Sequence, residues 1–239
     1  MIPKVIHYCW FGGKPYPKIV KKCINSWKTH CPDYELKLWN EQNYDLRKNR
    51  WLESACSSGK WAFVSDYARL DIVFREGGIY LDTDVELLRN LDDLLQYECF
   101  LAIENGPERS INTGIGFGAI RGHRAIGEML QEYDSLEFSE SGIRDLLCPP
   151  LNTKPFLSSG YRPGAQEIQF IKGAAILPPD YFDPIDGSLS ELHQTENTHG
   201  MHWKSGSWET GMTRWKTNFR LLIGLENCRR LKRFYKKKQ

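Results

Sequence analysis

The sequence of 239 residues lacks the marks of a disulfide-held or repetitive protein: it has no C-x-x-C pair, no internal repeat and no low-complexity tract. Its seven cysteines are scattered and odd in number, which favours free thiols in a reducing compartment. A chain of this length buries roughly 70% or more of its unfolded surface on folding. We therefore expect a core that needs no disulfide or metal to hold it.

Long hydrophobic runs are also missing. No stretch approaches the roughly 18 uncharged apolar residues of a membrane-spanning helix, so we expect no transmembrane segment. Residues 1–7 open directly on a strand-like pattern, without the basic and apolar regions of a signal peptide. We expect a cytoplasmic protein.

Acidic residues are almost absent from the C-terminal segment, residues 212–239. This segment holds ten Lys and Arg and one acidic residue, whereas the rest of the chain holds 22 basic and 29 acidic residues. Its apolar residues recur at roughly helical spacing: Trp215, Phe219, Leu222, Leu225, Leu231 and Tyr235. Basic amphipathic helices bind anionic membrane surfaces, at about 1 kcal/mol for each nearby cation. We expect this tail to attach the protein to the inner face of a bacterial plasma membrane.

Two other interpretations of the tail stay open. It can be a packing helix with a soluble, lysine-rich end. Nucleic-acid binding is the less favoured of the two interpretations, because the body of the protein is acidic and the aromatic residues of the tail form a helical stripe. We expect no nucleic-acid partner.

Hydrophobic periodicity predicts strands that alternate with helices up to residue 136. The predicted strands cover residues 4–11, 34–40, 79–84, 99–105 and 114–120, and the predicted helices cover residues 16–30, 58–78 and 123–136. This alternation predicts an α/β fold with a mostly parallel central sheet. Prolines predict loops over the sheet edge from residue 137 onward: Pro149, Pro150, Pro155, Pro163, Pro178, Pro179 and Pro184.

Asp82 and Asp84 follow the apolar residues 79–81. On a strand, residues two apart point to the same side, and ligands of open α/β sheets bind at the carboxyl ends of strands. We therefore expect both carboxylates to face one point, where Mg²⁺ or Mn²⁺ would bind them together with phosphate oxygens. A solvated turn is the alternative on spacing alone.

The surrounding sequence resembles a known family. Residues 64–86, VSDYARLDIVFREGGIYLDTDVE, are similar to the central DXD signature of glycosyltransferase family 32. That family includes yeast mannosyltransferases and bacterial capsular-polysaccharide enzymes, and it is distantly similar to the glucosylating clostridial toxins. Residues 2–13 resemble the family's first strand and loop. Residues 202–208, HWKSGSW, resemble its C-terminal signature with one residue more than expected.

The resemblance implies a GT-A fold, in which residues 1–211 form one catalytic domain that uses Mn²⁺ or Mg²⁺. It implies that Asp84 and His202 bind the metal directly and that Asp82 binds it partly through water. The expected catalytic residues are Asp66, Arg69, Asp82 and Asp84. The expected nucleotide-sugar site contains His7, Trp10, Asp66, Arg69, Tyr80, Asp82, Asn112, Ser207 and Trp208. In this set Trp10 stacks on uracil or borders it, and Ser207 and Trp208 close over the terminal phosphate.

Several of these residues have a structural alternative. Asp66 and Arg69 are three apart on one helix face and can form a local ion pair. Trp10 lies on a strand that is apolar on both faces, which favours a core aromatic. His7 on the same strand fits a hydrogen-bonded core histidine.

Other assignments are less constrained by the sequence. His199 competes with His202 as the metal ligand. Asn112 is a weak candidate for holding the donor sugar or the acceptor, and Glu104 is a candidate acid on the acceptor side. Asp71, one turn beyond Asp66, is expected to be solvated.

The resemblance implies a retaining transfer of a hexose from a UDP-sugar to a glycan acceptor. UDP-galactose is the preferred donor, and a lipid-linked oligosaccharide of capsule or O-antigen synthesis is the preferred acceptor. No nucleophile stands out, and a same-face displacement needs none. A metal ion and Arg69 would stabilise the charge that develops on the diphosphate.

Two rival functions also use an Asp-x-Asp pair. One is a Mg²⁺ phosphohydrolase of the haloacid dehalogenase type, disfavoured because Val85 and Glu86 follow Asp84 where a Thr or Ser is expected. The other is a non-catalytic module that binds a sugar or nucleotide through a cation.

Overall fold

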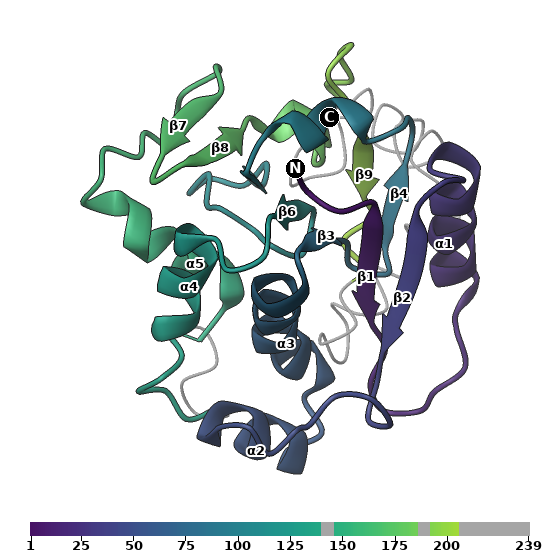
Figure 1. Ribbon diagram of the computed structural model, residues 1–239, viewed down its shortest axis with the longest axis vertical. Coiled ribbons are helices and arrows are strands. Elements are labelled where there is room, and N and C mark those ends of the chain that lie inside the picture. The colour runs from purple at the N-terminus through teal and green to yellow at the C-terminus, as the bar shows by residue number, and fades with distance from the viewer. Residues whose placement is uncertain (140–145, 186–191, 206–239) are drawn as a thin grey trace, which may run out of the picture.

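The structure, a computed structural model, describes residues 1–139, 146–185 and 192–205. Its central sheet has seven strands in the order β2-β1-β3-β6-β5-β8-β7 (Figure 1). Five strands run in one direction: β1 (Val5–Cys9), β2 (Glu35–Trp39), β3 (Gly78–Tyr80), β5 (Cys99–Ala102) and β8 (Ala174–Leu177). The other two, β6 (Phe117–Ala119) and β7 (Gln169–Ile171), run against them. The predicted α/β fold with a mostly parallel sheet is confirmed.

Two hydrophobic clusters cover the two faces of this sheet. In β5, Cys99 and Leu101 face the first cluster, whereas Phe100 between them faces the second. The described α-helices are α1 (Lys18–His30), α2 (Arg50–Ser57), α3 (Trp61–Glu76), α4 (Arg124–Gln131) and α5 (Cys148–Leu157). Residues of α2, α3, α4 and α5 belong to the first cluster, and residues of α1 belong to the second. Strands buried on both faces explain the near-continuous hydrophobic runs of the sequence.

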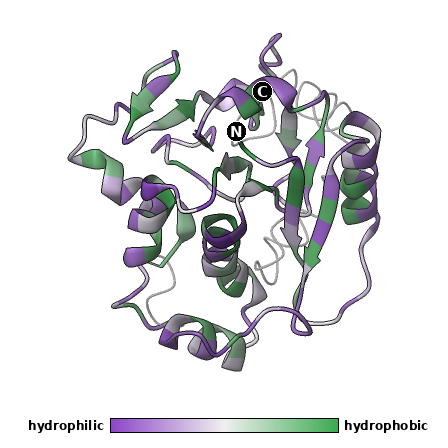
Figure 2. Cartoon of the chain, viewed as in Figure 1, coloured by the Kyte–Doolittle hydropathy of each residue, from purple (hydrophilic) through white to green (hydrophobic). Residues whose placement is uncertain are grey.

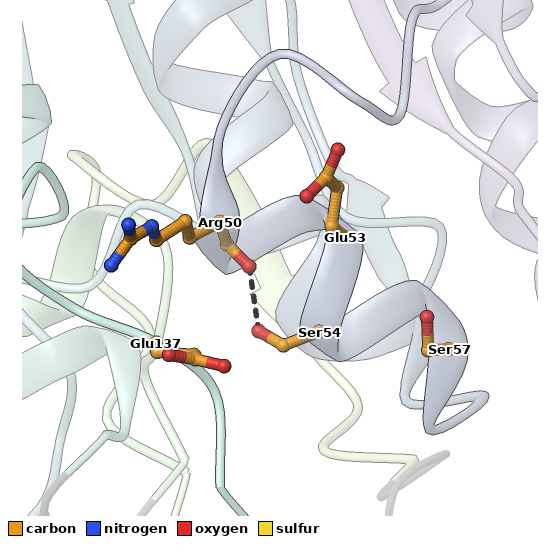
Figure 3. A pocket seen from close by; sticks show the side chains of 5 residues that line it. All are labelled: Arg50, Glu53, Ser54, Ser57 and Glu137. Carbon is orange, nitrogen blue, oxygen red and sulfur yellow. Dashed lines mark hydrogen bonds between the residues drawn. The ribbon is translucent and has the colours of Figure 1, made fainter.

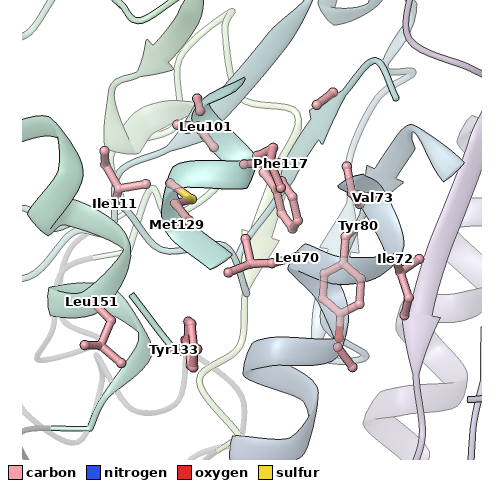
Figure 4. Packing of buried hydrophobic residues seen from close by; sticks show 14 of the residues in the cluster. Leu70, Ile72, Val73, Tyr80, Leu101, Ile111, Phe117, Met129, Tyr133 and Leu151 are labelled. Atoms are coloured by element: carbon pink, nitrogen blue, oxygen red, sulfur yellow. The ribbon is translucent and has the colours of Figure 1, made fainter. Parts of the chain in front are cut away.

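Helix α3 lies at the centre of the first cluster. Figure 4 shows Leu70 and Val73 of α3 packed among Phe117 of β6 and Met129 of α4. Helix α1 is amphipathic and packs on the second cluster. Figure 2 shows hydrophobic and hydrophilic residues alternating along it. Its buried residues contact the small antiparallel sheet of β4 (Val85–Leu87) and β9 (Gly200–His202). This small sheet lies on the same side of the central sheet as α1 and the 3-10 turns η1 (Asp92–Gln96) and η3 (Pro179–Tyr181).

The expectation of loops after residue 137 is wrong for several segments. Pro149 and Pro150 lie in the first turn of α5. Backbone N–H groups in the first turn have no acceptor within the helix, so proline costs no hydrogen bond there. Pro155 lies inside the same helix. Strands β7, β8 and β9 also follow residue 137. Helix α2 was not predicted either, and no described helix is long and apolar enough to cross a membrane.

Asp71 is buried rather than solvated, which corrects the expectation from the sequence. Its Oδ2 atom accepts hydrogen bonds from Tyr44 Oη at 2.8 Å, Lys48 Nζ at 2.6 Å and Arg75 Nε at 3.1 Å. The carboxylate thus ties α3 to the segment between β2 and α2.

Two glycines turn the chain from α3 into β3. Gly77 ends the helix at φ +71, and Gly78 begins the strand at φ +106. A Cβ atom on Gly78 would lie 2.9 Å from His7 Nε2 and 3.0 Å from the carbonyl oxygen of Val5. Only glycine combines this backbone with such close approach of β1, so the pair fixes where the strand leading to Asp82 starts.

Replacing Gly78 by alanine should lower the free energy of unfolding by about 2 to 4 kcal/mol, because strain at positive φ and a clash with β1 add together. The measurement is urea denaturation followed by fluorescence. Gly59→Ala is the matched control, since Gly59 also has positive φ (+64) but no atom lies within 4 Å of its Cβ position. Equal losses in the two variants would contradict the close-approach explanation.

Candidate active site

Asp82 and Asp84 lie in the link between β3 and β4. The predicted strand 79–84 is too long, because β3 ends at Tyr80 and β4 begins at Val85. The backbone N–H of Val85 donates to the carbonyl of Asp82 at 3.0 Å, which closes a turn over the intervening residues. The two carboxylates consequently do not follow the alternation of a strand, and each has its own set of partners.

Asp82 faces the helix α3. Its Oδ2 atom lies 3.4 Å from Arg69 Nη1, and its Oδ1 atom accepts a hydrogen bond from Tyr80 Oη at 3.0 Å. Arg69 is buried and also pairs with Asp66. One guanidinium therefore lies between two carboxylates, so the predicted ion pair of α3 is present and extends to the loop.

Burial governs the ionisation of these two acids. Burial raises the pKa of Asp66 to about 6, although the charge of Arg69 opposes the rise. Burial likewise raises the pKa of Asp82, again against Arg69, and the negative charge of Asp84 adds to the rise. Arg69 is the cation that opposes the rise in the pKa of both acids.

Asp84 faces the C-terminal strand. Its Oδ1 atom lies 3.5 Å from His202 Nε2, and its Oδ2 atom accepts hydrogen bonds from the backbone N–H of Ser205 at 2.9 Å and from its hydroxyl at 2.7 Å. Burial alone would raise the pKa of Asp84, but the charge of His202 and these hydrogen bonds hold it below its usual range. Burial lowers the pKa of His202, and Asp84 outweighs that effect and raises it.

The pairing of β4 with β9 brings His202 to Asp84. Val85 lies opposite His202 in the antiparallel register, so the residue just before β4 meets the end of β9. The backbone N–H of Trp203 donates to the carbonyl of Asp84 at 3.0 Å, and that of His202 donates to Phe182 at 3.2 Å. These backbone contacts fix the imidazole beside the carboxylate.

Among the described residues, no group of three or more His, Cys, Asp and Glu side chains is gathered to hold one metal ion. Of the predicted trio, Asp84 and His202 form a close pair, whereas Asp82 is turned to Arg69 and Tyr80. The pair fits a divalent cation, because an oxygen and a nitrogen donor lie side by side and a metal ion can replace the proton between them. His202 Nδ1 is buried without a hydrogen-bond partner in this arrangement.

His199 is placed differently from His202. Its Nε2 atom lies 2.8 Å from Asp93 Oδ1, and its Nδ1 atom lies 2.6 Å from the carbonyl oxygen of Asn197. Its ring stacks on those of Tyr181 and Phe182. Both nitrogens are used away from Asp84, so of the two histidines His202 is the one placed to bind a metal there.

Gly114 and Asn112 complete the Asp82 side of the site. The backbone N–H of Asp82 donates to the carbonyl of Gly114 at 3.0 Å, and a Cβ atom on Gly114 would lie 2.4 Å from Asp82 Oδ2 and 2.6 Å from Arg69 Nη1. Asn112 Oδ1 accepts from the N–H of Gly114 at 2.8 Å, and its Nδ2 donates to Glu104 at 2.9 Å. The loop after β5 is therefore packed against the ion pair.

Burial raises the pKa of Glu104, and its hydrogen bond from Asn112 opposes that rise. Lys204, Asp183 and His202 all act electrostatically on Glu104. The structure thus places Glu104 and Asn112 in the polar surroundings of His202, where the sequence left them without a fixed position.

His7 lies in the core, as the structural alternative expected, and its inclusion among the binding residues stays a prediction. Trp39 Nε1 donates to His7 Nδ1 at 3.1 Å, so the proton of the imidazole lies on Nε2 and is donated to the carbonyl of Gly77 at 2.8 Å. Burial lowers the pKa of His7. No ring nitrogen remains for a nucleotide.

Trp10 is partly buried at the end of β1. Its Nε1 atom donates to the carbonyl of Lys14 at 2.6 Å, and its ring meets that of Tyr16 edge to face. The ring is only partly buried. Its position is therefore compatible both with a core aromatic and with stacking on a base. Ser207, Trp208 and the predicted tail lie outside the described residues.

Sequence reasoning missed Ser205, Lys204 and Asp183. Lys204 Nζ lies 2.9 Å from Asp183 Oδ2, and Asp183 is fully buried. Lys204 and Ser205 lie within HWKSGSW, the segment that resembles the C-terminal signature of the family. Their closeness to His202 in the sequence could have indicated that they lie near the site. Nothing in the sequence points to Asp183.

A hollow lined by Arg50, Glu53, Ser54, Ser57 and Glu137 lies at α2 (Figure 3). It shares no residue with the surroundings of Asp84. Within it the Ser54 hydroxyl donates to the carbonyl of Arg50 at 2.7 Å. The hollow is separate from the candidate site.

The chain shares the fold of a glycosyltransferase. The PaToxG glycosyltransferase superimposes with a TM-score of 0.50 at 17% identity, over 66% of this chain and 69% of that chain. The mixed sheet with helices on both faces is a GT-A fold, as the sequence predicted.

Residues 17–101 match the family described as the glycosyltransferase sugar-binding region containing the DXD motif. The chain is 30% identical over 145 residues to inositol phosphoceramide mannosyltransferase 3 of Schizosaccharomyces pombe, covering 58% of this chain and 39% of that protein. It is 29% identical over 160 residues to lactosylceramide 4-alpha-galactosyltransferase of Rattus norvegicus, covering 60% and 41%. The chain spans about two fifths of the length of these curated relatives. Residues 17–101 therefore carry a region similar to the DXD region of that family, and Asp82 and Asp84 are its Asp-x-Asp pair.

Gly114→Ala should abolish binding of the sugar donor and lower the free energy of unfolding by about 1 to 3 kcal/mol, because the new methyl group separates Asp82 from Arg69. Donor binding is measured by calorimetry and stability by urea denaturation. Gly118→Ala is the matched control, since its Cβ would lie 2.6 Å from the ring of Phe100, away from the site. Donor binding that survives equally in both variants would contradict this arrangement.

Proposed function

We propose that the protein is a metal-dependent, retaining glycosyltransferase that moves a hexose from a UDP-sugar to a glycan acceptor. UDP-galactose is the donor of first choice. One observation carries the proposal: a single loop presents Asp82 to Arg69 and Asp84 to His202. The match of residues 17–101 to the glycosyltransferase sugar-binding region containing the DXD motif supports it.

Asp84 and His202 would hold the divalent ion. When bound, that ion supplies positive charge for the diphosphate that leaves with the nucleotide. An imidazole beside a carboxylate favours Mn²⁺ over Mg²⁺, because Mg²⁺ selects oxygen ligands more strictly. The Ser205 hydroxyl and N–H, which occupy Asp84 Oδ2, keep that carboxylate in one orientation.

Asp82, Arg69 and Asp66 would orient the donor sugar. Two carboxylates on one buried guanidinium form a rigid set of acceptors for sugar hydroxyls. Asn112, bonded to Glu104, would hold a further hydroxyl on the same side. We assign no enzyme nucleophile. Instead, the departing phosphate would take the proton of the acceptor hydroxyl, which attacks the sugar on the same face from which the phosphate leaves.

The acceptor in this proposal is a lipid-linked oligosaccharide of capsule or O-antigen synthesis, met at the cytoplasmic face of a membrane. Support comes from the names of the two curated relatives, each of which is a transferase named for a ceramide lipid. The basic tail, residues 212–239, would attach the protein to that membrane.

UDP with Mn²⁺ should stabilise the protein by nearly 3 kcal/mol at a hundredfold excess over the dissociation constant, which raises the melting midpoint by about 6 to 10 °C for a chain of this size. Thermal unfolding with UDP, GDP and CDP, each with and without Mn²⁺, measures the preference. Asp84→Ala should remove the metal dependence, because it deletes the carboxylate of the pair.

Stabilisation by GDP but not by UDP would indicate a GDP-sugar as the donor. If no nucleotide stabilises the protein, the proposal is rejected. Hydrolysis or transfer from UDP-galactose, followed by UDP release, separates an enzyme from a module that only binds. Release of inorganic phosphate from simple phosphate esters would instead support the phosphohydrolase alternative.

Removing residues 212–239 should release the protein from vesicles that contain anionic lipid, because ten of the cations lie in that segment. Co-sedimentation with phosphatidylglycerol vesicles measures the bound fraction, and phosphatidylcholine vesicles are the control. Unchanged binding after the deletion would contradict the role of the tail.

A further inference from the structure

The N-terminal part of the chain has no acidic residue before Asp33, yet it holds six lysines. Four of them are exposed on α1 or on the loop that leads into it: Lys14, Lys18, Lys21 and Lys28. Within residues 1–139, 146–185 and 192–205 none of these four forms an ion pair. We name these four the lysine face. Its charge is unusual in a body that otherwise holds more acidic than basic residues.

The lysine face is one side of an amphipathic helix. Lys18, Lys21 and Lys28 recur at helical spacing, whereas Val20, Cys23, Ile24 and Trp27 are buried on the opposite side. Helix α1 stands at the outside of the molecule beyond β2 and β4 (Figure 1). Thirteen helical residues extend for about 20 Å, so the cations can all touch one flat surface.

The helix also reaches the candidate active site. Lys22 on the flank of α1 lies 2.7 Å from Glu86 Oε2 and 4.5 Å above the ring of Trp203. Trp203 directly follows His202, and its Nε1 atom donates to the same Glu86 carboxylate at 2.9 Å. A surface that binds the lysine face would therefore lie next to the strand that carries His202.

We infer that the lysine face of α1 binds an anionic membrane surface and thereby presents the site beside His202 to acceptors in that surface. Charge complementarity carries the inference, because exposed lysines that form no ion pair with the described residues attract anionic headgroups. Partly buried Tyr16 and Ile19, at the start of the helix, supply apolar contact at the interface. Nucleic acid is a poorer occupant, because Trp27 is buried and Tyr16 packs against Trp10, so helix α1 presents no row of exposed aromatic rings to stack on bases.

Membrane binding by this face does not depend on transferase activity, whereas the role of presenting acceptors rests on the proposed function. The two are separated by measuring binding to vesicles without any nucleotide-sugar. If the protein binds vesicles through α1 but transfers no sugar, membrane binding by the lysine face stands and the role in presenting acceptors is rejected.

The test uses the full chain with Lys18→Gln, Lys21→Gln and Lys28→Gln combined. Glutamine keeps the helix and removes three charges. Affinity for vesicles of phosphatidylcholine and phosphatidylglycerol should fall about a hundredfold at low salt, given about 1 kcal/mol for each cation at the surface. Transfer to a soluble acceptor should stay as in the unaltered protein.

The matched control removes three cations from other faces: Arg47→Gln, Arg124→Gln and Lys154→Gln combined. These side chains are exposed on other elements, and the net charge change is the same. The control should retain vesicle affinity within about threefold, because surface charges farther than about 10 Å from the bilayer are screened at ordinary salt.

An equal loss in both triple variants would overturn the inference in favour of net charge alone. Unchanged binding in the α1 variant would overturn it in favour of the tail. Binding of the unaltered protein to a short DNA or RNA duplex more tightly than to anionic vesicles, with loss in the α1 variant, would assign the lysine face to nucleic acid instead.

Discussion

The site depends on one backbone pairing, that of β4 with β9. This small sheet is antiparallel, so the beginning of β4 meets the end of β9, and Asp84 meets His202. A buried carboxylate without a partner costs several kcal/mol, and here β9 supplies the imidazole and Ser205, three residues after the strand, supplies the hydrogen bonds that satisfy it. Loop, strand and α1 are then held in one place through Glu86 and Trp203.

A second constraint is the separation of two acids that are two residues apart. The turn between β3 and β4 sends Asp82 toward Arg69 and Asp84 toward His202. Each carboxylate therefore has its own nitrogen-bearing partner, and the turn keeps the two carboxylates from sharing one. The division also separates two tasks of the proposed reaction, since one acid belongs with the sugar and the other with the diphosphate.

The sequence could predict what depends on local spacing. The apolar periodicity of α3, the strand pattern of β1 and the position of the DXD motif all lie within short windows, and the structure has each of them. The strand at Asp82 was predicted too long because the two aspartates directly follow the apolar run 79–81, although the backbone turns after Leu81. Helix α5 was missed because its prolines normally end helices, whereas two of these lie where no N–H is needed. The partners of Asp84 could be named only through resemblance, since pairing across more than a hundred residues leaves no trace in local pattern.

His7 illustrates the remaining limit. A histidine on a central strand beside a glycine pair fits both a ligand site and a core, and only the positions of Trp39 and Gly77 distinguish them. Asp71 was likewise expected in solvent, because the distant Tyr44 and Lys48 that bury it cannot be recognised from the helix alone.

The late position of β9 also bears on biosynthesis. A nascent chain that has left the ribosome only as far as β8 already contains every strand of the central sheet, yet Asp84 still lacks His202. The Asp84–His202 pair can therefore form only after nearly all of the described chain has been synthesised. Premature termination in this interval would leave a product that contains every strand of the central sheet but lacks the imidazole partner of Asp84.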